Sequence, residues 1–387
     1  MHICFVLTSP FALNAFVAPT IRALLAQGWR VTVVVNAQAG LIAPDISAGV
    51  TVVDLEIARA IAPLSDLRAL WKLTRLFHAG RFDVVHSITP KAGLLAMMAA
   101  RMAGVPMRVH TFTGQVWATR RGPFKWLLRA LDTLLARCAT VLLADSPSQR
   151  EFLLEERVTT ADRLHVLAHG SIAGVDTARF APQPDWRLQV RQDLAIPSDA
   201  LLLAYIGRMH PEKGVLELCG AFVRIAVQVP QAHLLLVGPD EGVLAQALSM
   251  SAQVRERIHL VGLTQQPEKY MAAADIFCLA SYREGFGLSL IEAAAAGLPS
   301  VASRICGVTD AVVDGVTGLL VPARDVEALS QALIALAERP AFRLQLGLDA
   351  RARAEKDFSQ HALLQAWLGF YETYLPLKRI NTDIPRK

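Results

Sequence analysis

The most chemically informative stretch of the chain is the tetrapeptide Glu-Gly-Phe-Gly that begins at Glu284, followed by a second carboxylate at Glu292. An apolar run at 275–280 predicts a strand before it, and 288–296 predicts a helix that ends at Gly297. Glycines at such a junction let a ligand approach the backbone and leave helix N–H groups for an anion. Because carboxylates bind hydroxyls, the combination suits a nucleotide sugar. A plain strand–helix turn with two solvent-facing glutamates remains the alternative.

A second patch carries two cations. The apolar run 201–206 predicts a strand, and Gly207, Arg208, Lys213 and Gly214 follow it in a turn that opens a helix. The guanidinium fork and the ammonium group both favour phosphate oxygens, so this turn could hold a pyrophosphate without a metal ion. An ordinary cationic loop is the alternative.

Three ordered motifs give the chain a resemblance to glycosyltransferase family 4. They are the run 207–214, the Glu284/Glu292 pair, and the segment 302–322, which includes Gly-Val-Thr-Gly-Leu-Leu-Val-Pro at 315–322. Their order and spacing agree with the family over nearly the whole chain. The resemblance implies retaining transfer of a sugar from a nucleotide diphosphate sugar, on a two-domain fold of the GT-B type with a cleft between the domains.

The resemblance also implies roles for individual residues. Arg208 and Lys213 would bind the diphosphate, Glu292 the ribose hydroxyls, and Glu284 the sugar. His110, at the end of the predicted strand 107–112, would lie close to the sugar. We expect these donor-binding positions: Gly207, Val261, Gly262, Leu263, Gly285, Phe286, Gly287, Leu288 and Glu292. No cofactor and no metal ion is expected, since the nucleotide sugar is a substrate; a metal site at His165 and His169 is a weak alternative.

Alternating strand-like and helix-length segments predict an α/β fold with two tandem Rossmann-like domains and parallel sheets. The expected strands are 2–8, 30–36, 50–54, 83–86, 107–112, 139–144 and 163–167, then 201–206, 233–237, 258–261, 275–280 and 298–302. We expect an acceptor-side domain at 1–180, a donor-binding domain at 181–358, a helix at 359–375 that crosses back to the first domain, and a loose tail at 376–387.

Composition sets further limits. With 387 residues, 53% hydrophobic and 19% charged, the chain can form two cores. Five scattered cysteines without a Cys-x-x-Cys pair predict free thiols and a cytoplasmic protein. The start of the chain does not resemble a signal peptide, and the apolar segment 92–105 is too short to span a membrane. Residues 1–180 hold 19 Lys and Arg against 12 Asp and Glu, so the first domain should meet an anionic partner.

Two basic helices suggest what that partner is. Segment 64–81 aligns Arg68, Lys72 and Arg75, and segment 123–138 carries an apolar stripe beside cations. We expect these residues to face an anionic inner-membrane surface: Arg68, Lys72, Arg75, Arg120, Arg121, Lys125, Trp126 and Arg129. Trp117 is expected at the mouth of the cleft. The alternative is two domain helices with apolar faces in the core and solvated cations outside.

The loop after the first strand departs from the family. Many members have a Gly-Gly turn there, whereas this chain has Pro10, which stiffens the loop, and Asn14, which could cap the next helix. We therefore place the acceptor only loosely at Phe11 and Asn14.

The stretches 110–117 and 170–176 resemble bacterial enzymes that build O-antigen or capsule repeat units on undecaprenyl diphosphate. That resemblance implies a polyprenyl-diphosphate-linked saccharide as acceptor, a UDP-linked N-acetylhexosamine or hexose as donor, and peripheral attachment to the inner face of the cytoplasmic membrane. No nucleic acid is expected as a partner. A transferase for a soluble small molecule or glucan, a nucleotide-sugar epimerase and a non-catalytic pseudo-transferase remain alternatives. A nicotinamide dehydrogenase is disfavoured because no Gly-x-Gly-x-x-Gly follows the first strand.

Overall fold

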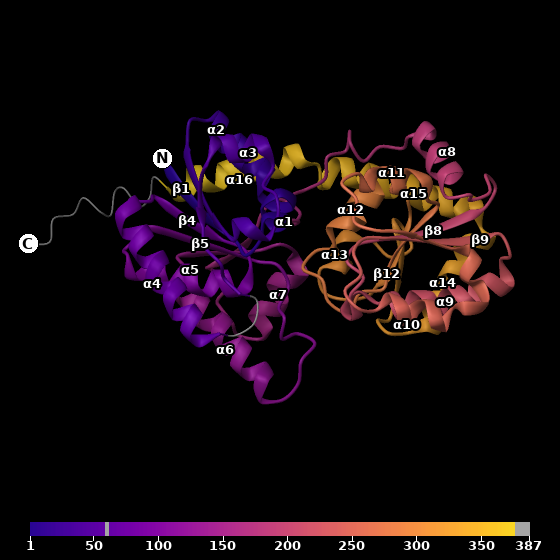
Figure 1. Cartoon of the computed structure of the whole chain (residues 1–387), viewed down its shortest axis with the longest axis horizontal. Coiled ribbons are helices and arrows are strands. Elements are labelled where there is room, and N and C mark those ends of the chain that lie inside the picture. Colours follow the sequence, from indigo (N-terminus) through magenta and orange to yellow (C-terminus); the bar gives the residue numbers. More distant parts are fainter. Residues whose placement is uncertain (59–61, 376–387) are drawn as a thin grey trace, which may run out of the picture. The chain divides into compact units, whose positions relative to one another are not determined.

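The computed structural model describes residues 1–58 and 62–375, and it divides into two compact units (Figure 1). Unit 1 contains Met1–Ala173 and the chain from His361 onward, and unit 2 contains Gly174–Gln360. The division lies before the expected boundary at 180 because the connecting segment packs with unit 2. Val175 donates its N–H to the carbonyl of Phe358, and Phe180 lies in the core of unit 2. The expected tail, 376–387, lies outside the described residues.

Unit 1 is built on a parallel sheet of seven strands in the order β3-β2-β1-β4-β5-β6-β7. The strands are β1 (His2–Val6), β2 (Arg30–Val35), β3 (Thr51–Asp54), β4 (Val84–Ser87), β5 (Met107–Phe112), β6 (Val141–Ala144) and β7 (Leu164–Val166). The central strands are buried along their length, as continuous apolar runs in a sheet covered on both faces must be.

Helices connect these strands, and most begin with proline, which suits the first helical turn because its missing N–H has no partner there in any case. They are α1 (Pro10–Ala12), η1 (Leu13–Val17), α2 (Ala18–Ala26), η2 (Ala37–Ala39), α3 (Pro44–Gly49), α4 (Pro63–Gly80), α5 (Pro90–Met102), α6 (Pro123–Cys138) and α7 (Pro147–Glu155). Both α4 and α6 pack against α5. No helix among residues 1–58 and 62–375 has the length and apolar content needed to span a membrane.

Unit 2 contains a parallel sheet of six strands in the order β10-β9-β8-β11-β12-β13. The strands are β8 (Leu201–Ile206), β9 (Ala232–Val237), β10 (Ile258–Val261), β11 (Ile276–Leu279), β12 (Ser300–Ser303) and β13 (Gly318–Val321). The α/β class and the parallel sheets are confirmed. Strand β13, which pairs with β12 at the edge of the sheet, was not predicted from the sequence.

The helices of unit 2 cover both faces of its sheet (Figure 1). They are α8 (Pro184–Asp193), η3 (Pro211–Lys213), α9 (Val215–Gln228), α10 (Leu244–Met250), η4 (Ala252–Arg257), α11 (Pro267–Ala273), α12 (Leu288–Ala295), α13 (Val308–Ala311), α14 (Val326–Glu338) and α15 (Pro340–Asp357).

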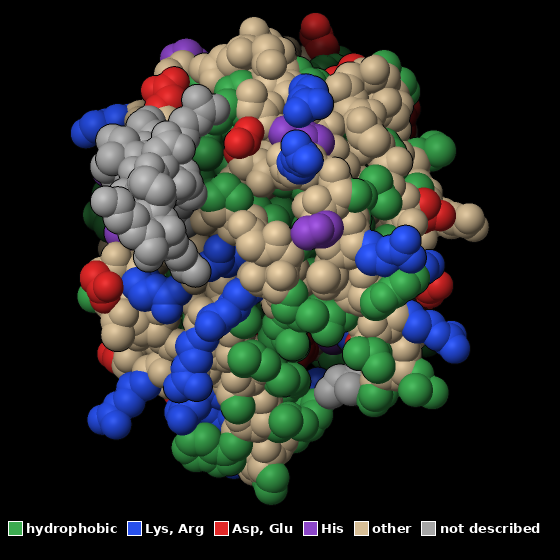
Figure 2. All heavy atoms as spheres, turned by 90° about the vertical axis from the view of Figure 1, so that its left-hand side faces the viewer, with side chains coloured by type: hydrophobic (Ala, Val, Ile, Leu, Met, Phe, Trp, Pro, Cys, Tyr) green, Lys and Arg blue, Asp and Glu red, His purple; other side chains and the backbone are tan. Residues whose placement is uncertain are grey.

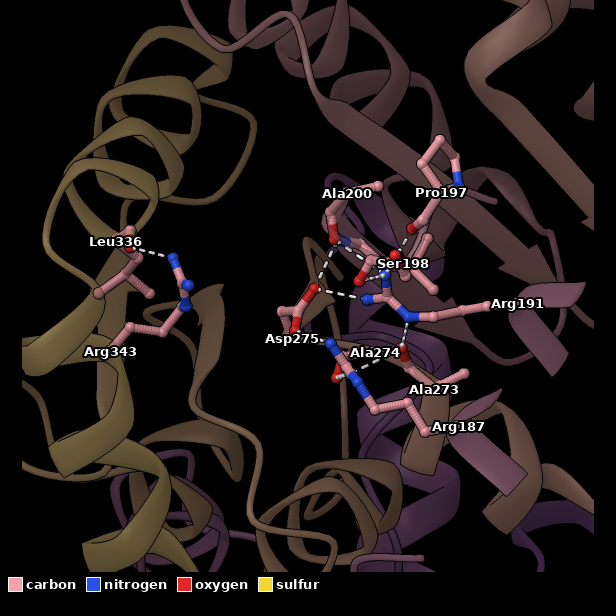
Figure 3. Close-up of polar contacts among 11 residues, drawn as sticks. Arg187, Arg191, Pro197, Ser198, Ala200, Ala273, Ala274, Asp275, Leu336 and Arg343 are labelled. Carbon is pink, nitrogen blue, oxygen red and sulfur yellow. Dashed lines mark hydrogen bonds and ion pairs between the residues drawn. The ribbon is translucent and has the colours of Figure 1, made fainter. Parts of the chain in front are cut away.

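A cluster of polar contacts fixes the start of two central strands of unit 2 (Figure 3). Asp275, just before β11, accepts hydrogen bonds from Arg187 at 2.7 Å, from Arg191 at 2.8 Å and from the N–H of Leu202 on β8 at 2.7 Å. The Arg191 guanidinium also binds backbone carbonyls, including that of Ala273. The carboxylate thus joins the start of β11 to the start of β8 and helps to hold the two strands in register. It lies at the end of these strands opposite to their C-terminal ends.

The last helix, α16 (Gln360–Tyr374), packs on unit 1, as expected for a helix that crosses back. The hydroxyl of Tyr371 lies 2.7 Å from Nδ1 of the buried His86, whose Nε2 lies 2.8 Å from Thr111. Trp367 stacks on Tyr371 and donates its indole N–H to the carbonyl of Ile172. A histidine from β4 thus joins the C-terminal helix to the first sheet.

Acid should unfold unit 1 through two buried histidines. Burial lowers the pKa of His86 to about 3, and the pKa of His110 is likewise lowered to about 3 by burial. In the unfolded chain they would take up protons near pH 6.5, so stability is lost as pH falls below that value, by about 2 kcal/mol per histidine at about pH 5. Urea unfolding of the wild type and of His86→Asn, above pH 6.5 and at about pH 5, measures this loss. The free energy of unfolding of the variant should fall less than that of the wild type. Equal losses in the two proteins would contradict the assignment to His86.

Candidate functional site in unit 2

The predicted motifs of unit 2 meet at the C-terminal edge of its sheet. Strand β8 ends at Ile206 and β11 ends at Leu279, and these two strands pair in parallel. Strand β9 pairs with the other side of β8, so the strand order reverses between β8 and β11. Ligands of open parallel sheets bind at such a reversal. The loops that carry Arg208 and Glu284 are therefore neighbours despite their separation in sequence.

Lys213 and Glu284 form an ion pair at this edge. The ammonium Nζ donates to Oε1 of Glu284 at 2.6 Å, and both side chains are mostly buried. The two loops can approach this closely because of Gly214, whose φ is +69° and whose added Cβ would lie 2.0 Å from the carbonyl oxygen of Ala280. Both charged residues were expected at the site, but their contact was not predicted from the sequence.

Arg208 has an acidic partner that was not predicted from the sequence. Its Nη1 donates to both carboxylate oxygens of Glu241, at 2.9 and 2.7 Å. Glu241 lies in the loop after β9, which is tied to the Arg208 loop because Met209 donates its N–H to the carbonyl of Pro239. An acidic residue shortly after the predicted strand 233–237 was the available signal. Side-chain exposure of 43% at Arg208 leaves part of the guanidinium open to an anion.

A second ion pair lies beside the first. Glu212 binds Nη2 of Arg283 at 2.8 Å, and its carbonyl accepts the N–H of Tyr282 at 2.8 Å. Each partner is the sequence neighbour of a proposed site residue: Glu212 precedes Lys213, and Arg283 precedes Glu284. The two loops are thus joined by consecutive ion pairs.

Packing in the interior of unit 2 fixes the Gly-Phe-Gly segment at 285–287. The Phe286 side chain is 4% exposed and lies edge-on to Phe358 at 5.2 Å between ring centroids. Gly287 has φ +81° at the N-cap of α12, and a Cβ on Gly307 would lie 2.0 Å from the carbonyl oxygen of Gly285. Only the backbone of this segment can therefore meet a ligand, beside the first N–H groups of α12, which begins at Leu288.

Glu292 is a partly buried carboxyl on α12. Burial raises its pKa to about 7, while the positive charge of Arg179 acts in the opposite direction and Glu268 adds to the increase. Arg179 itself donates to Oε2 of Glu268 at 2.8 Å. Neither Arg179 nor Glu268 was singled out from the sequence. A carboxyl that is costly to charge in the free protein is suited to gain partners when hydroxyl groups arrive.

Glu292→Gln should stabilise the protein at about pH 8 by about 2 kcal/mol and by much less at about pH 5. The folded pKa lies above the unfolded value of 4.5, so the wild type loses stability as pH rises from 4.5 through about 7. The amide has no charge to lose. Thermal unfolding of both proteins at the two pH values measures the difference. An identical gain at both would show that burial of charge is not the cause.

The positions expected near the base lie at the edge of the same sheet. Val261 is the last residue of β10, and its carbonyl accepts the N–H of Gly238 at 2.9 Å. Gly262 follows, and Leu263 is exposed. Gly207 donates its N–H to the carbonyl of Val237, which joins the turn after β8 to β9. These positions offer backbone groups at the sheet edge, as expected, and their binding role stays a prediction.

His110, expected close to the sugar, is enclosed in the structure. Its ring lies on β5 in the interior of unit 1, with Nδ1 2.9 Å from the hydroxyl of Ser87 and its edge against Phe112. A Cβ on Gly93 would lie 2.4 Å from the ring, so α5 covers it closely. His110 is thus a core histidine in this structure. Its expected place beside the sugar stays a prediction.

The loop after β1 also differs from expectation. Ser9, rather than Asn14, caps the first helix, because its hydroxyl accepts the N–H of Ala12. Asn14 instead binds the 41–43 segment: it donates to the carbonyl of Leu41 at 2.8 Å and accepts the N–H of Ala43 at 3.1 Å. Phe11 is exposed and available to a ligand.

The apolar stripe of helix α6 is divided between the surface and the core of unit 1. Phe124, Leu127 and Leu134 are exposed, and Trp126 beside them is 59% exposed, whereas Leu135 is buried and Leu128 packs against the core. Trp117, expected at a cleft mouth, is instead wholly buried. Its indole N–H donates to Asp132 of α6 at 2.7 Å.

The predicted membrane-facing cations divide into two groups. Lys125 and Arg129 both bind Glu156, each at 2.9 Å, so one carboxylate compensates part of their positive charge. The remaining cations are exposed on α4 and on the segment before α6: Arg68, Lys72, Arg75, Arg120 and Arg121. The alternative of a metal site at His165 and His169 is disfavoured, because Nε2 of His165 lies 3.0 Å from the hydroxyl of Tyr374.

Comparison with known proteins places both units. Residues 200–339 match the family model described as "Glycosyl transferases group 1", and residues 12–170 match "Glycosyl transferase 4-like domain". Among solved structures, the Anabaena protein HepE, crystallised with UDP and glucose, has a TM-score of 0.79 at 20% identity, covering 96% of this chain and 100% of its own.

Three relatives are similar over most of their length. The capsular polysaccharide biosynthesis glycosyltransferase CapM of Staphylococcus aureus is 28% identical, covering 83% of this chain and 84% of its own. The Escherichia coli UDP-Gal:alpha-D-GlcNAc-diphosphoundecaprenol alpha-1,3-galactosyltransferase is 28% identical over 72% of each chain. The D-inositol 3-phosphate glycosyltransferase of Saccharomonospora viridis is 32% identical, covering 76% of this chain and 70% of its own. The chain is therefore a glycosyltransferase and belongs to glycosyltransferase family 4, with the two-domain fold of the GT-B type.

Proposed function

We propose that this enzyme moves a hexose or N-acetylhexosamine, with retention of configuration, from a UDP-sugar to a saccharide on undecaprenyl diphosphate in bacterial surface polysaccharide assembly. The observation that carries the donor half of this proposal is the Lys213–Glu284 pair, with Arg208 beside it, at the strand-order reversal of unit 2. The acceptor half is supported by the printed activities of two relatives, one in capsule synthesis and one acting on a diphosphoundecaprenol substrate.

The proposed chemistry is a displacement on one face of the sugar. The bond between C1 and the phosphate oxygen breaks while the acceptor oxygen bonds to C1 on the same face. Arg208, Lys213 and the N-terminus of α12 would stabilise the charge that develops on the departing diphosphate. A phosphate oxygen of that group would take the proton of the acceptor hydroxyl. Glu284 would hold sugar hydroxyls and Glu292 the ribose, so no covalent glycosyl intermediate is needed.

The donor and acceptor can be tested together. Purified enzyme is incubated with a panel of UDP- and GDP-sugars, each with a polyprenyl-diphosphate-linked GlcNAc or with soluble acceptors, and nucleotide release and product configuration are measured. Release of UDP that depends on the lipid-linked acceptor, with an α-linked product from an α-linked donor, is the expected result. Release with a soluble polyol phosphate alone would instead favour a second function, which the similarity to D-inositol 3-phosphate glycosyltransferases supports.

Attachment to an anionic membrane would bring the enzyme to such an acceptor. Helices α4 and α6 both pack on α5, and each exposes apolar side chains, with Leu64, Leu67 and Trp71 on α4. Figure 2 shows hydrophobic side chains gathered on the lower part of this end of unit 1, with Lys and Arg side chains around them. Exposed aromatic and apolar groups beside cations are suited to the interface of an anionic bilayer.

The acidic residues of these two helices do not oppose that role. α4 has one, Asp66, which binds Lys91 at 2.6 Å, and α6 has one, Asp132, which accepts from Trp117. The helix that carries the exposed cations Arg68, Lys72 and Arg75 therefore has one acidic residue, and that residue is already bound to a lysine. This charge pattern favours anionic lipid over zwitterionic lipid.

Flotation with liposomes tests the attachment. We expect binding to vesicles of phosphatidylglycerol and phosphatidylcholine at low salt, and a loss of about tenfold or more in Trp126→Ser/Leu127→Ser. The matched control is Leu344→Ser/Leu348→Ser, which removes two exposed apolar side chains from α15 of unit 2. Equal binding by both double variants would count against the α4–α6 surface.

A further inference from the structure

A cavity of about 340 Å³ opens on unit 1 between the C-terminal half of α6 and the segment that links α7 to β7. It is lined by three arginines, three threonines and a few apolar side chains: Thr133, Ala136, Arg137, Leu154, Arg157, Val158, Thr159, Thr160 and Arg163. No acidic side chain lines it. The cavity lies at the N-terminal edge of the sheet, because β7 begins at Leu164, directly after Arg163. It therefore belongs to neither the donor site nor the acceptor loop.

The charges around the cavity are positive and only partly compensated. Arg137 and Arg157 form no ion pair with any described residue. Arg163 uses Nη2 to cap α6, donating to the carbonyls of Ala136 at 2.9 Å and Ala139 at 2.5 Å. Three carboxylates are neighbours of lining residues in sequence: Glu155, Glu156 and Asp162. Glu156 binds Lys125 and Arg129, and Asp162 accepts a hydrogen bond from Thr160, which lowers its pKa. Two guanidinium groups are thus left to bind an anion.

The wall of the cavity also contains a hydroxyl that has no partner among the described residues. Oγ1 of Thr159 is buried and makes no hydrogen bond to any of the residues 1–58 and 62–375. A buried hydroxyl without a partner is costly, and such groups in native proteins usually bind a solvent molecule or a ligand. Thr133, across the cavity on α6, uses its own hydroxyl to bind the carbonyl of Arg129.

Arg157 occupies a backbone position that normally favours glycine. It follows the end of α7 with φ +53°, donates its N–H to the carbonyl of Leu154, and lets Val158 donate to the carbonyl of Leu153. This is the pattern in which helices end with a left-handed residue, and glycine is the usual occupant. An arginine there keeps a guanidinium at the cavity at a cost in backbone strain.

From these observations we propose that the cavity binds a phosphate group, held by the guanidinium groups of Arg137 and Arg157 and by the Thr159 hydroxyl. Guanidinium forks and hydroxyls are the groups that recognise phosphate oxygens in proteins. The volume accommodates a phosphate together with a small organic substituent. The phosphate could come from a soluble phosphate ester or from the headgroup of an anionic lipid, since α6 also carries the exposed Phe124, Trp126 and Leu127.

The backbone of Arg157 supplies a variant that separates binding from folding. Arg157→Gly removes the cation and relieves the left-handed strain, so the protein should unfold at the same temperature or higher. The matched control is Arg81→Gly. Arg81 also follows a helix, α4, in the left-handed region with φ +45°, and it does not line the cavity. Both variants lose one positive charge and one strained position.

Binding is measured in the full chain carrying Arg208→Ala/Lys213→Ala, which removes the proposed diphosphate contacts and keeps this test independent of them. Inorganic phosphate is titrated by calorimetry at constant ionic strength, and vesicles of phosphatidylglycerol in phosphatidylcholine are tested by flotation. We expect Arg157→Gly to weaken binding of at least one probe by about tenfold and Arg81→Gly to leave it unchanged. Loss with inorganic phosphate assigns a soluble ligand, and loss with vesicles alone assigns a lipid headgroup. No binding of either probe, or equal binding by the two glycine variants, would overturn the proposal.

Discussion

Lys213→Ala should lower kcat by about 100- to 1000-fold with the natural donor and acceptor, since a preorganised cation on a developing negative charge is worth that much. The ammonium group is mostly buried and lies 2.6 Å from Glu284, so it is already fixed before the donor arrives. A fixed charge needs little reorganisation when the diphosphate departs. Arg208→Ala should cost less, about tenfold to 100-fold, because its side chain is more exposed and solvent weakens its effect.

The measurement is steady-state release of UDP, with UDP binding measured in parallel by calorimetry. Lys269→Ala is the matched control, because Lys269 is in the same unit and lies over the ring of Trp186 rather than at the sheet edge. Thermal unfolding of each variant shows whether the fold is intact. Normal turnover in both Lys213→Ala and Arg208→Ala would refute the proposed diphosphate site.

The elements that position this site could be predicted because their sequence signals are local. Continuous apolar runs predicted β8 and β11, and the glycines around Lys213 and Glu284 predicted the turns that follow them. The sequence did not predict that these strands are neighbours, since strand order depends on packing between distant segments. The missed ion pair between Lys213 and Glu284 is a consequence of that order.

The burial of individual side chains was harder to predict than the strands. His110 and Arg208 both lie at or near a strand end, yet one is enclosed by α5 and the other is exposed. The strands of a sheet that is covered on both faces are apolar along their length. The pattern of apolar and polar residues therefore does not tell which side chains near a strand end are exposed to solvent. The helical stripe on α6 likewise did not tell which of its side chains are buried, since Leu135 is enclosed while Phe124 and Leu127 are exposed.

Glu241 shows a limit of motif-based prediction. The motifs identified the cations, but each cation has its own carboxylate in this structure, and only Glu284 was named among the partners. The loop after β9 reaches Arg208 because Gly238 has φ +136° and leaves no room for a Cβ beside the carbonyl oxygen of Gly207. That close approach depends on two strands side by side, which is a property of the folded sheet.

Separating Glu212 from Arg283 should lower kcat by about tenfold to 100-fold while leaving the unfolding temperature within a few degrees. Their ion pair, at 2.8 Å, is flanked in sequence by the one between Lys213 and Glu284. We expect Glu212→Ala and Arg283→Ala each to let the two loops shift apart. Small displacements of groups at a reacting centre have large effects on rate, so kcat should fall more than the affinity for UDP.

A charge exchange shows whether the pair itself is responsible. Glu212→Arg and Arg283→Glu should each be more harmful than alanine, because each places two like charges within a few ångströms of one another. The double variant restores an ion pair across the same gap, and kcat should recover by about tenfold relative to the worse single variant. Coupling of that size is expected only for residues in direct contact.

The control is the same exchange at an ion pair far from the sheet edge. Arg351 and Glu355 form an i,i+4 pair on α15 with both side chains well exposed, so Arg351→Glu/Glu355→Arg should change neither kcat nor stability measurably. If the double variant at Glu212 and Arg283 were as inactive as the single ones, the charges would have to act separately on the substrate. Recovery of kcat with unchanged UDP affinity would instead show that both residues position the site. If the ion pair only stabilised the fold, the exchange would restore the unfolding temperature and not kcat.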